Sequence, residues 1–545
     1  MSASTGAARL IDRIVPSFCI ALWLLLAPLL ALSYLRIAPS PDQALFDYIA
    51  WAHLHGDIYY AGVAEQNWPG AMFLHEWAIR LFGTEFWTWR AFDFLLMQIA
   101  TLSGALLLWR AGLGWAPWIV LLVYPAIYVT SGAWFAGQRD IYAAGFLLLA
   151  AALSLGARRR NERPTDGWGV LLAGAAVGAA VLVRPTYLSF LVGLAALELL
   201  RFRDEPQRGV ARGLGRIAAL LGGFALIIGL VVLAGWLAGA LDDFYIQSIL
   251  FNTESYQQGE PRGRLTGVMA EWFLRAWHWQ TALAGLGLLV WLLRDGLTRA
   301  LVLVLGLGAT GLLSFWVQNK GFGYHLGAMP LVLTLLMAAG MDGLARGFAG
   351  AGRLAGPTAW PKPAGTPLWR GLSAGLLCLS VGLMGLGLAK RILDASHWLR
   401  ADPGKAWLLP EGIGEDGLSW NSVSAMVARI DAETPPDGFV LQWGRSFQIP
   451  YLAERRPTLR FVSTPALTIM TPAFSAYQDW MDEIAGEMIE RRPAFAIVGK
   501  KELDRAAAGQ LSAAERLIHD GIDDYRPVLE GETAILLQAP ESTAP

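Results

Sequence analysis

Residues 216–240 read RIAALLGGFALIIGLVVLAGWLAGA, and a run of this kind decides the fold class. Its only charged residue is Arg216, at the first position. About 20 apolar residues in a helix cross the hydrocarbon core of a bilayer, so this run is long enough to span a membrane. The whole chain has the same character, since 55% of its 545 residues are hydrophobic and 16% are charged. Because so few charges cannot coat a soluble protein of this size, we predict a membrane protein.

Composition also excludes several classes. The chain is too apolar for a disordered protein, and a net charge of −1 gives no indication of a nucleic-acid partner. Its two cysteines, Cys19 and Cys378, both lie inside apolar runs. They are too few for a disulfide framework or a zinc site, so no metal site is predicted from them.

The predicted fold is mainly α, with about 11 transmembrane helices and a small C-terminal α/β domain. Two of the apolar runs are short, so the number of spans carries an uncertainty of one or two. The predicted spans are 14–35, 88–109, 115–132, 140–157, 168–184, 187–200, 216–240, 281–293, 300–317, 326–345 and 371–390.

Arginine and lysine residues gather on alternate loops, which predicts the orientation of the chain. The basic loops include 158–163, 201–216 and 346–370, and they place the N-terminus in the cytoplasm. The first span follows Arg9 and Arg13, as the apolar part of a signal peptide follows basic residues. However, it exceeds 20 residues and lacks the small residues of a signal-peptide cleavage site. We therefore expect an uncleaved anchor.

Two domains follow from this topology: a transmembrane catalytic domain, 1–390, and an extracytoplasmic α/β domain, 391–545. The first external loop covers 36–87, and within it 69–83 predicts an amphipathic helix lying in the membrane interface. In the C-terminal domain, Phe439–Trp443 and Ala494–Val498 are typical of buried strands, and Leu529–Leu537 predicts a hairpin.

Ionisable residues that a bilayer disfavours collect on the external side, which indicates a shared cavity. Carboxylates come from the first loop and the start of the fourth span, and cations from three inter-helix junctions. A carboxylate can take the proton of an acceptor, and cations can hold a phosphate leaving group. The candidate catalytic acids are Asp47, Asp140, Glu65 and Asp42, and the candidate donor-phosphate ligands are Lys320, Arg184, Arg139 and His325.

Each of these residues also has a structural interpretation. Asp47 or Asp42 suits a helix N-cap, Asp140 suits a helix start or an ion pair with Arg139, and Lys320 suits the membrane interface. His53, His55 and Asp57 could form a metal site only if they shared one face, as they would on a strand. A helix is expected there, so no metal site is predicted from them.

At these residues the chain resembles the GT-C superfamily of integral-membrane glycosyltransferases, most closely the protein O-mannosyltransferases and the lipid A aminoarabinose transferases. The resemblance covers about 390 residues and rests on a set of motifs in order. These are Phe46-Asp47-Tyr48, His55-Gly56-Asp57-Ile58-Tyr59-Tyr60, Glu65-Gln66-Asn67-Trp68-Pro69, Leu81-Phe82-Gly83 with Arg90, Gln138-Arg139-Asp140 and Arg184-Pro185-Thr186.

The chain departs from the mannosyltransferase pattern at three points. Tyr48 stands where an acidic pair has its second acid, Trp68 replaces one proline of a double proline, and the spacing from Asp47 to Glu65 is shorter than expected. These departures concern the acceptor rather than the fold.

The resemblance implies inverting transfer of a sugar from a polyprenyl-phosphate donor to an envelope lipid, glycan or protein. It implies this on the periplasmic face of a bacterial inner membrane, with Asp47 as the base. No cofactor is predicted, and a divalent cation remains open. Two alternatives remain: a transporter or flippase of lipid-linked saccharides, and a non-catalytic binder of such lipids. Charges gathered at one face and the lack of a visible repeat favour the enzyme over the transporter.

Overall fold

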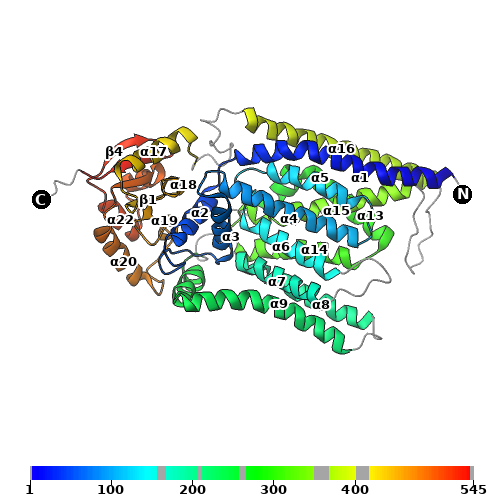
Figure 1. Cartoon of the computed structure of the whole chain (residues 1–545), viewed down its shortest axis with the longest axis horizontal. Coiled ribbons are helices and arrows are strands. Elements are labelled where there is room, and N and C mark those ends of the chain that lie inside the picture. The colour runs from blue at the N-terminus through cyan, green and yellow to red at the C-terminus, as the bar shows by residue number, and fades with distance from the viewer. Residues whose placement is uncertain are drawn as a thin grey trace.

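The computed structural model describes residues 3–155, 167–204, 210–256, 265–348, 367–400 and 417–540. A helix stands at each of the predicted spans (Figure 1). These helices are α1 (Ala3–Leu35), α4 (Thr88–Arg110), α5 (Ala116–Val129), α6 (Arg139–Leu155), α7 (Gly167–Val183), α8 (Ser189–Asp204), α9 (Val210–Leu237), α13 (His278–Asp295), α14 (Arg299–Gln318), α15 (Met329–Phe348) and α16 (Pro367–Arg400).

The chain is a multi-pass membrane protein with a mainly helical fold. Within the described residues, 6 helices are long and apolar enough to cross a membrane, and three shorter apolar helices accompany them. The number of eleven spans therefore stays a prediction. Of the basic loops, 158–163 lies outside the described residues, as do parts of 201–216 and 346–370.

Helices pack closely where glycine replaces a larger side chain. A Cβ added to Gly174 of α7 would lie 1.9 Å from the Leu220 carbonyl oxygen of α9. A Cβ on Gly223 of α9 would lie equally close to the Leu171 oxygen of α7. Small residues let the two backbones approach, as is usual between membrane helices.

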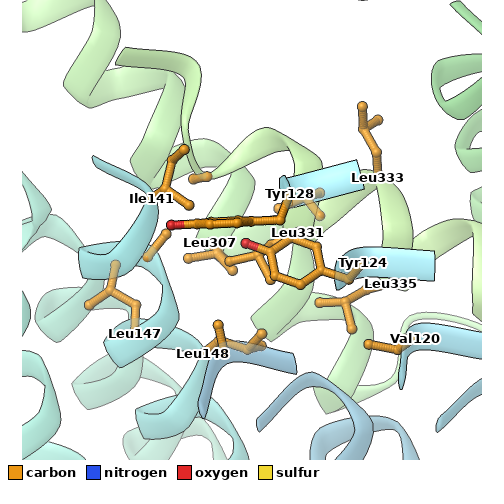
Figure 2. Close-up of a cluster of buried hydrophobic side chains, with 14 of the residues drawn as sticks. Val120, Tyr124, Tyr128, Ile141, Leu147, Leu148, Leu307, Leu331, Leu333 and Leu335 are labelled. Carbon is orange, nitrogen blue, oxygen red and sulfur yellow. The ribbon is translucent and has the colours of Figure 1, made fainter. Parts of the chain in front are cut away.

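The centre of the bundle is a buried apolar cluster built around α5 (Figure 2). Tyr124 and Tyr128 of α5 pack there with leucines from three other helices, among them Leu148 of α6, Leu307 of α14 and Leu335 of α15. Figure 1 shows α1 and α16 together along one edge of the bundle and α9 along the opposite edge.

One buried polar network fixes the start of the first loop to this core. Tyr34 of α1 and Tyr128 of α5 both donate hydrogen bonds to the Asp93 carboxylate of α4. Arg90, one turn earlier on α4, donates to the carbonyl oxygens of Ile37 at 3.1 Å and Ala136 at 2.9 Å. The network therefore determines where the first loop leaves the bundle.

The first loop forms two helices, α2 (Pro41–Leu54) and α3 (Gly70–Phe82), which lie between the bundle and the C-terminal part of the chain (Figure 1). The helix predicted at 69–83 is present as α3. The segment between α9 and α13 forms short helices. They are α10 (Leu241–Tyr245), the π-helix η3 (Ile246–Leu250), α11 (Phe251–Glu254), α12 (Leu265–Glu271) and the π-helix η5 (Trp272–Ala276).

The C-terminal part is a small α/β unit, as predicted. Its five-stranded sheet has the order β2-β1-β3-β5-β4. The strands are β1 (Phe439–Trp443), β2 (Arg456–Pro457), β3 (Phe495–Gly499), β4 (Arg526–Glu530) and β5 (Ala534–Gln538). The first three run parallel, whereas β5 is antiparallel to β3 and β4. The helices are α17 (Trp420–Glu433), α18 (Gln448–Leu452), α19 (Thr464–Leu467), α20 (Tyr477–Glu490), α21 (Lys500–Ala507) and α22 (Ala513–Asp520).

This sheet unit is held directly against the first loop. The Tyr48 hydroxyl donates to the Arg455 carbonyl oxygen at 2.9 Å, and the Ala64 amide donates to the Arg460 oxygen at 2.8 Å. Phe447 and Tyr451 pack into the same apolar cluster as α2. The connections after β1 and β2 are thereby fixed beside the helix that carries Asp42.

Candidate functional site

A cavity of about 1740 Å³ lies where the first loop, the helix bundle and the C-terminal unit meet. Its walls come from α2 and the 65–68 segment, the α5–α6 and α14–α15 connections, η1 (Pro185–Leu188), the η3–α11 segment, η5, the C-terminal part of α16, and the connections after β1 and β2. Segments far apart in sequence therefore share one hollow.

Most of the site residues predicted from sequence lie on this wall. The residues that line it are Asp42, Glu65, Arg139, Arg184, Lys320 and His325. The other two predicted residues, Asp47 and Asp140, are not among its lining residues and are buried behind it.

Asp42 is the wall carboxylate at the start of α2. It follows Pro41 in the first helical turn, where the helix dipole favours a negative charge. The amide of Ser40 donates to the Gln43 side-chain oxygen at 3.0 Å, which fixes this end of the helix. The Tyr324 hydroxyl donates to Asp42 Oδ2 at 3.5 Å, across the cavity wall from the α14–α15 connection. Asp42 is therefore a half-buried carboxylate on the wall whose direction is fixed by the start of α2.

Glu65 is deeply buried and is linked to the Arg139 guanidinium through the side chain of Asn67. Its Oε1 accepts hydrogen bonds from the backbone and side-chain nitrogens of Asn67, and the Asn67 Oδ1 accepts one from Arg139. The Arg139 guanidinium also lies 5.2 Å from the ring centre of Phe46. Burial raises the pKa of Glu65 even though Arg139 lowers it. Within the described residues, Glu65 Oε2 has no hydrogen-bond partner.

Arg184 reaches the wall with its charge balanced by Asp140. The Arg184 Nε donates to Asp140 Oδ1 at 2.8 Å, and Arg184 Nη2 donates to Asp140 Oδ2. The Tyr187 hydroxyl fixes the Asp140 backbone by donating to its carbonyl oxygen at 2.8 Å. Such a two-point pair sets the plane of the guanidinium, so Asp140 positions Arg184.

Asp47 points away from the cavity, into the contact between α2 and α3. It is 3% exposed, and His75 Nδ1 lies 2.7 Å from its Oδ1. The His75 ring stacks on Trp89, with centroids 3.5 Å apart and planes 11° apart. Burial lowers the pKa of His75 although the Asp47 carboxylate raises it, and the carboxylate accepts a hydrogen bond from His75 Nδ1.

Lys320 and His325 occupy the α14–α15 connection. Asn319 and Gly321 turn the chain there with φ of 49° and 67°. The Lys320 ammonium donates to the Tyr256 carbonyl oxygen and lies 4.0 Å from the centre of the Tyr256 ring. His325 is buried, and its ring meets that of Tyr324 edge-on with centroids 4.7 Å apart.

Several wall residues were not predicted as site residues. Asn67 lies inside a quoted motif, but its link between Glu65 and Arg139 depends on tertiary contacts. Arg445 follows β1, and the carboxyl end of a parallel strand is a common place for ligand contacts. Its position after a predicted strand could therefore have marked Arg445 as a candidate site residue. Tyr324 gave no sequence signal beyond its aromatic neighbours.

No group of three or more histidine, cysteine, aspartate or glutamate side chains is arranged to hold a metal ion in the part of the chain that the structure describes. A divalent cation therefore stays open, as in the sequence analysis.

Comparison with known proteins identifies the fold. No protein-family model matches the sequence, and no curated protein matches it. The crystal structure of ArnT from Cupriavidus metallidurans in the apo state superposes with a TM-score of 0.58 at 15% identity, covering 98% of each chain. The structure of the same protein bound to undecaprenyl phosphate gives a TM-score of 0.56 at 14% identity, covering 100% of both chains. The chain therefore has the ArnT fold, and the GT-C resemblance predicted from its motifs is confirmed at the level of fold.

Proposed function

We propose that this protein is a membrane glycosyltransferase that moves a sugar from a polyprenyl-phosphate donor to an envelope acceptor, with inversion. The observation that carries the proposal is the single cavity in which Asp42 and Glu65 share the wall with Arg139, Arg184 and Lys320. The ArnT structure of the same fold was solved with undecaprenyl phosphate, which supports a lipid-linked donor.

Asp42 is the proposed general base. It lies on the wall and its charge is favoured by the start of α2, whereas Asp47 faces His75. In the reaction, the acceptor oxygen or nitrogen bonds to the anomeric carbon while its proton passes to Asp42. The bond from that carbon to the phosphate oxygen breaks, and its electron pair stays on the phosphate. The products are the glycosylated acceptor and polyprenyl phosphate.

The cations on the wall are proposed to hold the donor phosphate. Lys320 supplies an ammonium, and Arg139 and Arg184 supply guanidinium groups whose positions are fixed by Asn67 and Asp140. His325 lies beside them and can donate a hydrogen bond. Charge builds on the phosphate as the bond breaks, so fixed cations stabilise the transition state more than the bound donor.

Asp47 and Asp140 then act through other residues. Asp47 holds α3 to α2 through His75, and Asp140 orients Arg184. Glu65 orients Arg139 through Asn67 and remains the second candidate for the base.

The predicted topology is kept as part of the proposal. The N-terminus would be cytoplasmic and the cavity periplasmic, at the inner membrane of a bacterium. The division into domains 1–390 and 391–545 also remains a proposal, with α16 continuing past that boundary to Arg400. The C-terminal unit contributes Arg445 and Phe447 to the wall, so it would help to bind the acceptor lipid, glycan or protein.

The proposal is tested by sugar transfer from radiolabelled undecaprenyl-phosphate sugars to envelope extracts with purified protein. Asp42→Asn should lower the turnover of folded protein by about 100-fold to 10,000-fold, the usual contribution of a general base. The control is Asp57→Asn, which removes a first-loop carboxylate that is not among the lining residues of the cavity. Wild-type turnover in Asp42→Asn would remove the assignment of the base.

The phosphate ligands are tested by affinity for undecaprenyl phosphate. Lys320→Met should weaken binding about 10-fold to 100-fold, because a charged hydrogen-bond donor is lost. Lys390→Met, on an exposed part of α16, is the matched control. Transbilayer movement of a labelled donor without any transfer would instead favour the transporter, and binding without either would favour a non-catalytic binder.

A further inference from the structure

Three aromatic rings form a nearly parallel set on the cavity wall, here named the aromatic ledge: Trp134, Phe322 and Tyr324. The Phe322 and Tyr324 centroids are 5.4 Å apart with planes 12° apart, and the Trp134 and Tyr324 centroids are 6.2 Å apart with planes 14° apart. All three residues are partly exposed and line the cavity, so a ligand in the cavity can reach the ledge.

The ledge is preformed because the connections that carry it are fixed. Trp134 lies in the turn after α5, between Gly132 and Gly137, whose φ values of 88° and 81° favour glycine. On the other connection, Gly323 lies so close to Trp272 that an added Cβ would be 2.0 Å from the indole nitrogen. The rings of His325 and Tyr324 also pack nearly perpendicular to each other. A ligand would therefore meet the rings already in place.

The position of the ledge relative to the charged groups is specific. Phe322 is two residues from Lys320, a proposed ligand of the donor phosphate, and the Tyr324 hydroxyl lies 3.5 Å from Asp42. The ledge therefore joins the phosphate end of the site to the proposed base. In a polyprenyl-phosphate sugar, a single oxygen joins the sugar ring to the phosphate. The ring must therefore lie close to the phosphate cations and expose its anomeric carbon toward the base.

We infer that the aromatic ledge binds the sugar ring of the donor and selects a pyranose with several C–H bonds on one face. The faces of aromatic rings carry negative charge and attract such C–H groups. A flat six-membered ring with mainly equatorial hydroxyls presents a continuous C–H face, whereas a puckered furanose presents a smaller and less regular one. This inference rests on the proposed function, and it specifies the class of donor sugar.

The experiment compares the affinities of purified full-length protein for three probes: undecaprenyl phosphate, undecaprenyl-phosphate glucopyranose and undecaprenyl-phosphate arabinofuranose. Wild-type protein should bind the pyranose lipid more tightly than the bare lipid phosphate, with a smaller gain for the furanose. Trp134→Ala and Phe322→Leu should reduce the pyranose affinity by about threefold to tenfold and leave the affinity for bare lipid unchanged. Trp134→Phe, which keeps a ring, should retain more of that gain than Trp134→Ala.

The matched control is Trp236→Leu, since Trp236 is an exposed aromatic residue of α9 that does not line the cavity. An equal loss of affinity for bare undecaprenyl phosphate in Trp134→Ala would overturn the inference, because the ledge would then bind the prenyl chain. Unchanged pyranose binding in both ledge variants would also overturn it, while the proposed function would stand. Failure of wild-type protein to bind any of the three lipids would instead contradict the proposed function.

Discussion

The buried pair Asp140–Arg184 gives the most quantitative prediction. Asp140 is 0% exposed, and two nitrogen atoms of Arg184 donate to its two carboxylate oxygens. Replacing one partner leaves the other buried without its counter-charge, which typically costs about 3–5 kcal/mol. Asp140→Asn and Arg184→Gln should each lower the free energy of unfolding by that amount.

The double variant distinguishes a coupled pair from two separate contributions. Independent losses would sum to about 6–10 kcal/mol. Because the double variant removes both charges together, we expect it to cost about as much as one single variant.

The free energy of unfolding can be measured from SDS titrations in mixed micelles, followed by loss of helical circular dichroism. All four proteins, including the wild type, are compared at the same detergent and protein concentrations. A double variant whose loss equals the sum of the single losses would refute the coupling, and with it the conclusion that Asp140 positions Arg184.

Two further predictions concern Glu65 and the ledge connection. Burial raises the pKa of Glu65, so its ionisation disfavours the folded state as pH rises through that pKa. Glu65→Gln should therefore have a higher melting temperature than wild type at neutral pH and should lose this advantage below about pH 4. A difference in melting temperature that does not change with pH would contradict the burial effect. Gly323→Ala forces a Cβ against Trp272 and should cost about 1–3 kcal/mol in unfolding free energy. Gly222→Ala in α9, where a Cβ meets nothing within 4 Å, is its control, and equal stability of the two variants would show that Trp272 moves freely.

The helices could be predicted because length and apolarity are local properties of the sequence. The predicted span 88–109 is the helix Thr88–Arg110, and the strand Phe439–Trp443 was predicted with the same bounds. Strand β2 has only two residues and gives no periodic signal.

The site was harder to predict because burial on one face of a helix depends on its neighbours. Asp42 and Asp47 lie five positions apart on α2, which places them about 140° apart around the helix axis. Sequence alone does not show which of these directions α3 covers, and the family motif drew attention to Asp47. Asp140 follows Arg139 directly, yet a rotation of about 100° takes it from the wall into the pair with Arg184.

Some features required the full tertiary structure. Arg445 and Phe447 reach the cavity only because the sheet unit packs on the first loop, through contacts such as Tyr48 with the Arg455 backbone. No spacing within one segment indicates such an arrangement, although the position after a parallel strand marks Arg445 as a candidate.

The central claim is that a lipid-linked phosphate binds inside the cavity. The most direct measurement is an experimental structure of the protein in a lipid nanodisc with undecaprenyl phosphate. We predict phosphate density within hydrogen-bonding distance of the Lys320 ammonium and the Arg139 guanidinium, on the side of the cavity that carries the aromatic ledge. Phosphate density outside the cavity would contradict the account.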